Sequence, residues 1–212
     1  MTNFIPIFPL AMVVFPDELL QLHIFEPRYK QLITECFESK KPFGIPSVIN
    51  SKISEMGTLV DIISIQKHYE NGEMDILVKG VDIFRILEVV EELPEKLYSG
   101  AIVNYPENRR LGKREMMEKI LEGIRTLHDG LNIRKDFLKK DHELWSYDVA
   151  HFAGLSLHEE YDFLCLLHEL QREEYLKQHL LKVIRAIAEK KSDKEHIKLK
   201  DHFKHLPGFS LN

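Results

Sequence analysis

The first half of the chain carries short runs of apolar residues, rich in Ile and Val, that are separated by Pro, Gly and Asn. This pattern is typical of β-strands, which are short and bounded by turn-forming residues. Six or seven short strands in succession indicate a small barrel or sandwich. The runs that predict strands are residues 5–8, 19–24, 43–49, 57–67, 74–79, 81–90 and 101–105.

Two local signals refine this β-rich half. Pro46 interrupts the run 43–49 and has no N–H to donate to a ladder, so it predicts an edge position or a bulge. Asn71-Gly72 lies between two strand-like runs, and this pair supplies the positive φ angles that a tight hairpin turn needs. We therefore expect a β-hairpin with its turn at residues 69–73.

One helix interrupts the strands. Pro27 suits the first turn of a helix, and Glu26 before it favours the positive helix end. The segment ends before Lys41-Pro42, and its apolar residues follow helical spacing: Tyr29, Leu32, Ile33, Cys36 and Phe37.

From about residue 110 the apolar spacing changes to the 3.6-residue period of α-helices. A first amphipathic helix closes near Gly130 and carries Met116, Met117, Ile120, Ile124, Leu127 and Leu131 on one face. A short helix is expected at residues 147–153, stopping at Gly154. Ser156 and Glu159 then form a capping-box pattern.

That capping box is expected to open one long helix, running from about Leu157 into the 180s. Its apolar face would carry Leu164, Leu167, Leu170, Leu176, Leu180, Leu181, Ile184 and Ile187. The mixed-charge tail, residues 189–205, either prolongs this helix or frays. The polar stretch 106–112 is the expected boundary, which predicts an α+β chain with a β-rich subdomain at 1–108 and an α-helical subdomain at 109–212.

Composition narrows the functional classes. The 212 residues are 44% hydrophobic and 30% charged, with a net charge of −5 and a pI near 6.1, which argues against a general nucleic-acid binder. Neither a signal peptide nor an apolar run of membrane-spanning length is evident, and Cys36 and Cys165 are interpreted as reduced thiols. We expect a cytoplasmic protein.

The motifs of catalysis and metal binding are missing from the sequence. Among the eleven histidines there is no His-Glu-x-x-His, and only His202 and His205 have helical metal-pair spacing. The phosphate-binding loop, the dinucleotide fingerprint and the nucleophile elbow are also absent. Glu159, Glu160 and Asp162 fall at a helix start, and the basic runs at 109–114 and 190–200, which lie among acidic residues, are expected to be solvated. We expect no enzyme, no cofactor and no metal.

A longer composite pattern carries a family resemblance. Ile5-Pro6-Ile7-Phe8-Pro9-Leu10, Val13-Val14-Phe15-Pro16 and Leu20-Gln21-Leu22-His23-Ile24-Phe25-Glu26-Pro27-Arg28-Tyr29 stand in order, followed by Phe43-Gly44-Ile45, Gly57-Thr58-Leu59-Val60 and residues 78–86. Leu155-Ser156-Leu157 and Leu170-Gln171-Arg172-Glu173-Glu174-Tyr175-Leu176 complete the pattern. It resembles the N-terminal, substrate-binding domain of the Lon protease family, to about residue 188.

The resemblance implies a fold and a role. The fold is a PUA-like, six-stranded pseudo-barrel with one inserted helix, followed by a helical subdomain with a long last helix. The role is a non-catalytic protein- or peptide-binding module for unfolded or tagged polypeptides, using exposed β-edges or an apolar groove. The alternative is a small-molecule or RNA-binding PUA-like domain. Because the chain ends at Asn212, we expect a stand-alone member without the ATPase and protease domains.

Within the opening block, most residues are interpreted as fold-making. Phe8, Phe15 and Phe25 are the expected core anchors, and Arg28 is a candidate partner for a buried or half-buried carboxylate. No binding residue is identified from the sequence.

Overall fold

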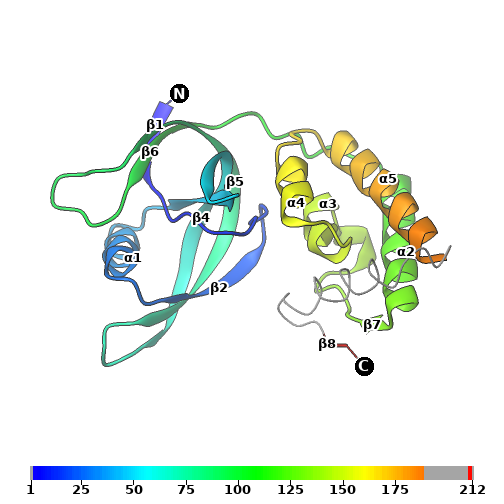
Figure 1. The fold of residues 1–212 in the computed structure, drawn as a ribbon, viewed down its shortest axis with the longest axis horizontal. Helices are drawn as coiled ribbons and strands as arrows, with labels where there is room; N and C mark the ends of the chain where they lie inside the picture. Colours follow the sequence, from blue (N-terminus) through cyan, green and yellow to red (C-terminus); the bar gives the residue numbers. More distant parts are fainter. Residues whose placement is uncertain (1, 189–209, 212) are drawn as a thin grey trace. The chain divides into compact units, whose positions relative to one another are not determined.

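The computed structural model describes residues 2–188 and 210–211, and it divides the chain into two compact units, Met1–Asn108 and Arg109–Asn212 (Figure 1). The first unit is β-rich and the second is helical, so the chain has the α+β character that the sequence predicts. The charged tail, residues 189–205, including His202 and His205, lies outside the described residues.

The described residues of the first unit form six strands and one helix. Their bounds are β1 Thr2–Pro6, β2 Leu19–Ile24, α1 Pro27–Ser39, β3 Phe43–Ile49, β4 Lys52–His68, β5 Met74–Val90 and β6 Gly100–Asn104. The antiparallel sheet has the order β1-β6-β5-β4-β3, and β2 pairs with β5 beside this path. The ladder is not closed, but Ile7 and Leu10 form isolated parallel bridges to β3, at Gly44 and Ser47.

The long strand β5 differs from the two separate strands that we expected on either side of Gly80. It runs without interruption because Gly80 lets another part of the backbone come close. A Cβ at Gly80 would lie 2.2 Å from the carbonyl oxygen of Phe15. The amide of Gly80 donates to Glu18 O at 2.9 Å, and its carbonyl accepts from Asp17 N at 3.0 Å. The glycine thus marks a crossing of two chain segments and not the end of a strand.

The hairpin and the Pro46 irregularity are both found. The hairpin between β4 and β5 turns at residues 69–73, where Gly72 has a φ of 77° and its N–H donates to Tyr69 O at 2.9 Å. Asn71 does not have a positive φ, so only one residue of the Asn-Gly pair uses the left-handed region. In β3 the register shifts between Pro46 and Val48, as expected for a residue that cannot donate.

The core of the first unit packs α1 against the sheet. Tyr29, Leu32, Ile33 and Cys36 of α1 are buried, and burial raises the pKa of the Cys36 thiol to about 11. Phe8 and Phe15 are buried, which confirms two of the three expected anchors. The third is wrong: Phe25 lies between β2 and α1 and is 58% exposed, and its ring stacks on the ring of His23.

The second unit is built from helices. Their bounds are α2 Arg114–Leu131, α3 Ser146–Val149, α4 Leu157–Leu164 and α5 Glu169–Ala188, with short 3-10 helices at Asp141–Glu143 and Ala150–Phe152. Strands β7 Ile133–Arg134 and β8 Ser210–Leu211 pair with each other. Helix α2 packs along α5, and its left-handed C-cap is Asn132, two residues beyond the expected closure at Gly130.

The single long helix expected from Leu157 is wrong, because residues 165–168 separate α4 from α5. The incoming chain binds at this break: Arg109 N–H donates to Leu167 O at 2.7 Å, and Glu169 N–H donates to Arg109 O at 2.9 Å. A continuous helix would use the Leu167 carbonyl internally. The capping box before α4 is confirmed, with the Ser156 hydroxyl accepting from Glu159 N–H and the Glu159 carboxylate accepting from Ser156 N–H.

Candidate functional site

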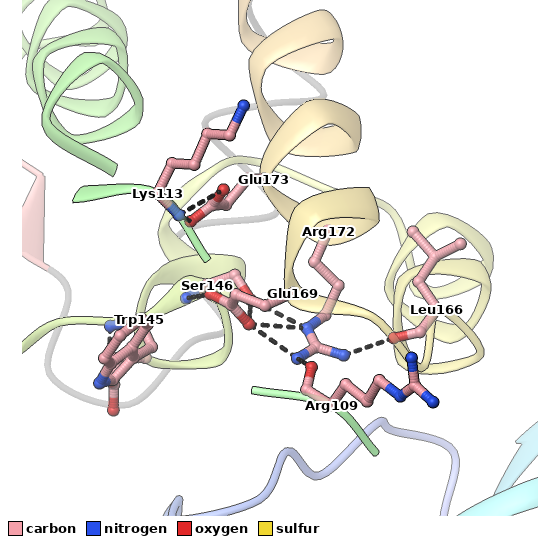
Figure 2. Close-up of polar contacts among 9 residues, drawn as sticks. Arg109, Lys113, Trp145, Ser146, Leu166, Glu169, Arg172 and Glu173 are labelled. Atoms are coloured by element: carbon pink, nitrogen blue, oxygen red, sulfur yellow. Dashed lines mark hydrogen bonds and ion pairs between the residues drawn. The ribbon is translucent and has the colours of Figure 1, made fainter. Parts of the chain in front are cut away.

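The first turn of α5 carries three charged side chains that are almost completely buried (Figure 2). Arg172 has no exposed surface, and Glu169 and Glu173 are each 1% exposed. Charged groups are rarely buried without partners, because leaving water costs several kcal/mol per ion. The partners of these three residues therefore define how the helical unit is held together.

Arg172 and Glu169 form an ion pair that joins several segment ends. Arg172 Nη2 lies 2.7 Å from Glu169 Oε2, and Arg172 Nη1 donates to the Leu166 carbonyl at 2.5 Å. Arg172 Nη2 also donates to Arg109 O at 3.3 Å. The Glu169 carboxylate accepts from the amide and the hydroxyl of Ser146, at 2.9 and 2.8 Å. One helical turn thus fixes the end of α4, the start of α3 and the incoming chain.

Glu173 holds the start of α2. Its carboxylate accepts from Lys113 N–H at 2.8 and 3.1 Å, next to a helix N-terminus that has no side-chain cap of its own. A carboxylate is favourable at this positive helix end. Burial raises the pKa of Glu173, against the hydrogen bond from Lys113. The preceding residue must be Gly112, because a Cβ there would lie 2.2 Å from Glu173 Oε1.

A row of aromatic rings leads from this buried cluster to the surface. The guanidinium of Arg172 lies 4.1 Å from the ring centroid of Tyr147. Tyr147 meets Phe163 edge-on at 5.9 Å, and Phe163 packs against Tyr175 at 5.8 Å. Tyr175 OH donates to the backbone carbonyl of Glu159 at 3.4 Å. A continuous series of contacts therefore links the buried ion pair to Tyr175.

Tyr175 lines a groove of about 650 Å³ along α5. The apolar part of its wall is made by Leu166, Leu170 and Tyr175. The polar lining residues are Glu159, Gln171, Glu174, Gln178, His179 and Lys182. The groove therefore combines an apolar surface with amide and charged groups along its length.

The exposed leucines of α5 correct the expected apolar face. Leu176 and Leu180 are buried as predicted, but Leu170 is 50% exposed and Leu181 is 42% exposed. The single face predicted from apolar spacing joined residues from two sides of the helix. The inner side is occupied at Arg172 by the buried cluster, which leaves Leu170 in the groove.

The charged groups in the groove are already paired within the chain. Glu174 accepts from Gln178 at 2.7 Å and from Lys177 at 3.0 Å, and these bonds lower its pKa. For Glu159, burial opposes ionisation, but hydrogen bonds from Ser156 and the nearby His179 and Lys182 outweigh burial and lower its pKa. Both carboxylates are thus charged near neutral pH.

The other residues named from the sequence have structural partners. Glu160 is buried beside His151, with 2.7 Å between Oε1 and Nδ1. Arg114, in a basic run expected to be solvated, donates to three backbone carbonyls at residues 141, 142 and 144. Arg28 pairs with Glu26, with 2.8 Å between Nη2 and Oε2; Arg28 is exposed and Glu26 is half-buried, so the partner found is a half-buried carboxylate and not a core one.

The described residues offer no cluster of three or more His, Cys, Asp or Glu side chains that could hold a metal ion. None of the helices in the described part of the chain combines the length and apolar character needed to cross a membrane. Two features of the described residues resemble the surfaces expected for docking, which stay a prediction. One is the groove, and the other is the edge of β2, which pairs only with β5 among the described strands.

The fold is similar to that of two solved Lon domains. The Lon N-terminal domain protein from Xanthomonas campestris has 19% identity and a TM-score of 0.62, over 82% of this chain and 96% of that chain. The N-terminal domain of the Mycobacterium avium complex Lon protease has 12% identity and a TM-score of 0.60, over 84% of this chain and 98% of that chain. At these identities the likeness concerns the fold.

The family follows from the sequence match. The model of the ATP-dependent protease La (LON) substrate-binding domain matches residues 5–197. The chain belongs to this family, as the N-terminal pattern of residues predicted. The matching domain is the substrate-binding one, not the ATPase or the protease.

The groove and the buried cluster were both missed by sequence reasoning. The segment 170–176 was used as evidence for the family, but its residues were not separated into an inner and an outer side. One signal was available: Arg172 and Glu173 interrupt an otherwise apolar face of α5. Charges on the buried face of a helix indicate partners elsewhere in the fold.

Proposed function

We propose that this protein is a non-catalytic module that binds polypeptide segments, and that the groove of α4 and α5 is its binding surface. The main observation that supports this proposal is the exposure of Leu170 in a groove that is also lined by Leu166 and Tyr175. Apolar side chains gathered in a surface groove typically mark a site of interaction. Membership of a substrate-binding family supports a polypeptide as the occupant.

The chemistry of the groove favours polypeptides over nucleic acid. Nucleic-acid surfaces need basic side chains that neutralise phosphates. Here Lys182 lies near Glu159, and Lys177 is paired with Glu174, so the lining is electrically balanced. Gln171 and Gln178 supply amides that can bond to a peptide backbone, while the leucines accept apolar side chains.

We place this activity in a reducing compartment such as the cytoplasm. Cys36 and Cys165 are both free thiols, and secreted proteins usually pair such residues in disulfides. The polypeptides recognised there would be unfolded or tagged segments that expose apolar side chains.

The test is binding of fluorescein-labelled β-casein, an unfolded model polypeptide, measured by fluorescence anisotropy. Leu170→Asp puts a charge into the groove and should weaken binding at least about tenfold, because a central apolar anchor typically contributes more than 1 kcal/mol. Leu138→Asp is the matched control, since Leu138 is 98% exposed in the same unit and does not line the groove. Equal binding by wild type and Leu170→Asp would refute the proposed surface.

A further inference from the structure

The exposed side of α5 forms a single stripe that is centred on Gln178. Its members recur every three or four residues, so they share one face of the helix. They are all exposed: Leu170, Gln171, Glu174, Gln178, Leu181, Lys182 and Arg185. The buried residues of α5, among them Arg172, Leu176 and Leu180, lie on the opposite side.

The charges on this stripe are sorted along the helix. Glu174 lies four residues before Gln178, and Lys182 lies four residues after it, with Arg185 one turn further. Tyr175, which is half-buried beside the stripe, lies three residues before Gln178, and Leu181 lies three residues after it. Among the members of the stripe, the acidic Glu174 thus lies in the first half, and the basic Lys182 and Arg185 lie in the second.

We infer that this stripe is an interface for a second copy of the chain, with the two α5 helices packed antiparallel around a twofold axis near Gln178. A twofold axis brings the acidic half of each helix to the basic half of its partner. Glu174 of each copy then lies near Lys182 of the other, and Tyr175 near Leu181. A parallel arrangement would bring like charges together.

The neighbouring charges are compatible with this partner. Within one chain, Glu174 is paired with Lys177, and the side chain of Glu174 remains 50% exposed. Lys182 lies near Glu159, but it too is exposed. Carboxylate and ammonium groups can take part in more than one ion pair, so the contacts across the axis add to those within the chain.

The second copy would cover the groove, and this part of the inference rests on the proposed function. Leu170, Gln171 and Glu174 belong both to the stripe and to the groove lining. Self-association and polypeptide binding therefore compete for the same surface. At low protein concentration the monomer would predominate and its groove would be free. At high concentration the second copy would cover the groove.

The test is charge reversal, followed by sedimentation velocity across a dilution series of the full chain. Wild type should show a reversible monomer–dimer equilibrium. Glu174→Lys and Lys182→Glu should each raise the dimer dissociation constant about tenfold or more, because each reverses two attractive contacts per dimer. An equimolar mixture of the two variants should form a heterodimer of near wild-type affinity, and the double variant should dimerise again.

Three results overturn the inference: a wild type that stays monomeric, single variants that dimerise as wild type does, and a mixture that does not associate. Circular dichroism of each variant checks that it is folded. Labelled β-casein separates this inference from the proposed function. If charge-reversal rescue occurs and casein does not bind, the dimer stands and the proposed function fails. If casein binds the dimer as tightly as the monomer, competition is refuted and the proposed function stands.

Discussion

Glu169 and Arg172 bind each other inside the helical unit, with 2.7 Å between Oε2 and Nη2 and with side-chain exposures of 1% and 0%. An ion pair so deeply buried gains less from its own attraction than it loses in hydration. Its hydrogen bonds to Ser146, Leu166 and Arg109 offset that loss. The pair therefore holds the start of α3 and the chain at Arg109, which are distant in the sequence, against the break before α5.

Replacing Arg172 by Met should lower the free energy of unfolding of the helical unit by about 3–5 kcal/mol, because Glu169 would stay buried without a positive partner. Urea denaturation followed by the fluorescence of Trp145, the single tryptophan, measures this loss. Lys177→Met is a matched control, since Lys177 and Glu174 have the same three-residue spacing on α5 but are exposed. The control should change stability by less than about 1 kcal/mol. Similar losses in the two variants would contradict the role of the buried pair.

Gly112→Ala should destabilise the helical unit by about 1–3 kcal/mol, since the added Cβ would lie 2.2 Å from the Glu173 carboxylate, which would have to leave Lys113 N–H. Gly130→Ala is the control within α2. A Cβ there would meet only Ile187 Cγ2 at 3.5 Å, an ordinary contact, and should stabilise the helix by up to about 1 kcal/mol. Thermal unfolding of both variants tests the opposite signs. Unchanged stability of Gly112→Ala would mean that the Glu173 carboxylate can move aside without loss.

The sequence predicted the elements whose signals are local. The strand at 19–24, the helix starting at Pro27 and the capping box of Ser156 were all correct, because each depends on residues within a few positions. The register shift at Pro46 follows from a missing N–H, which is also a local property. The chemistry of nearby residues is sufficient to predict these features.

The features that failed depend on contacts between distant residues. The break at residues 165–168 contains no proline or glycine, and it exists because Arg109 binds Leu167. Leu170 was assigned to the buried face because apolar spacing cannot show that Arg172 occupies the interior. The groove could not be predicted for the same reason. Its position depends on a buried charge whose partners are 26 and 63 residues away in the sequence.

Acidification should destabilise the helical unit through His128 and His179. Burial is the main cause that lowers the pKa of each imidazole below the ordinary value of 6.5. The unfolded chain therefore binds protons first, so stability falls as the pH drops below about 6.5 towards the folded pKa values. Each ring donates from Nε2 to a backbone carbonyl, at Phe152 and Ala153 respectively.

Urea midpoints of Trp145 fluorescence, compared at about pH 7.5 and about pH 5.5, should show this fall. The variant His128→Gln/His179→Gln removes both titrating groups but keeps a donor at each position, so its midpoint should depend less on pH. An equally steep fall in the double variant would assign the effect to other groups.

The contribution of His23 to the stability of the first unit should change with pH in the opposite direction. Asp75 Oδ1 lies 2.7 Å from Nδ1 and Glu73 Oε2 lies 3.3 Å from Nε2, so both ring nitrogens face a carboxylate. The hydrogen bond to Asp75 is the largest cause that raises the pKa of His23. The stabilisation by the imidazolium is therefore complete below the unfolded value of 6.5, and it is lost as the pH rises through the folded pKa.

Asp75→Asn should lower the pKa of His23 more than Glu73→Gln does, and histidine NMR titrations measure both values. Since Asp75 also accepts from Tyr69 OH at 2.8 Å, Tyr69→Phe checks whether this second bond supports the pair. A His23 titration that is the same in Asp75→Asn and in wild type would show that the cross-strand contact does not hold the proton.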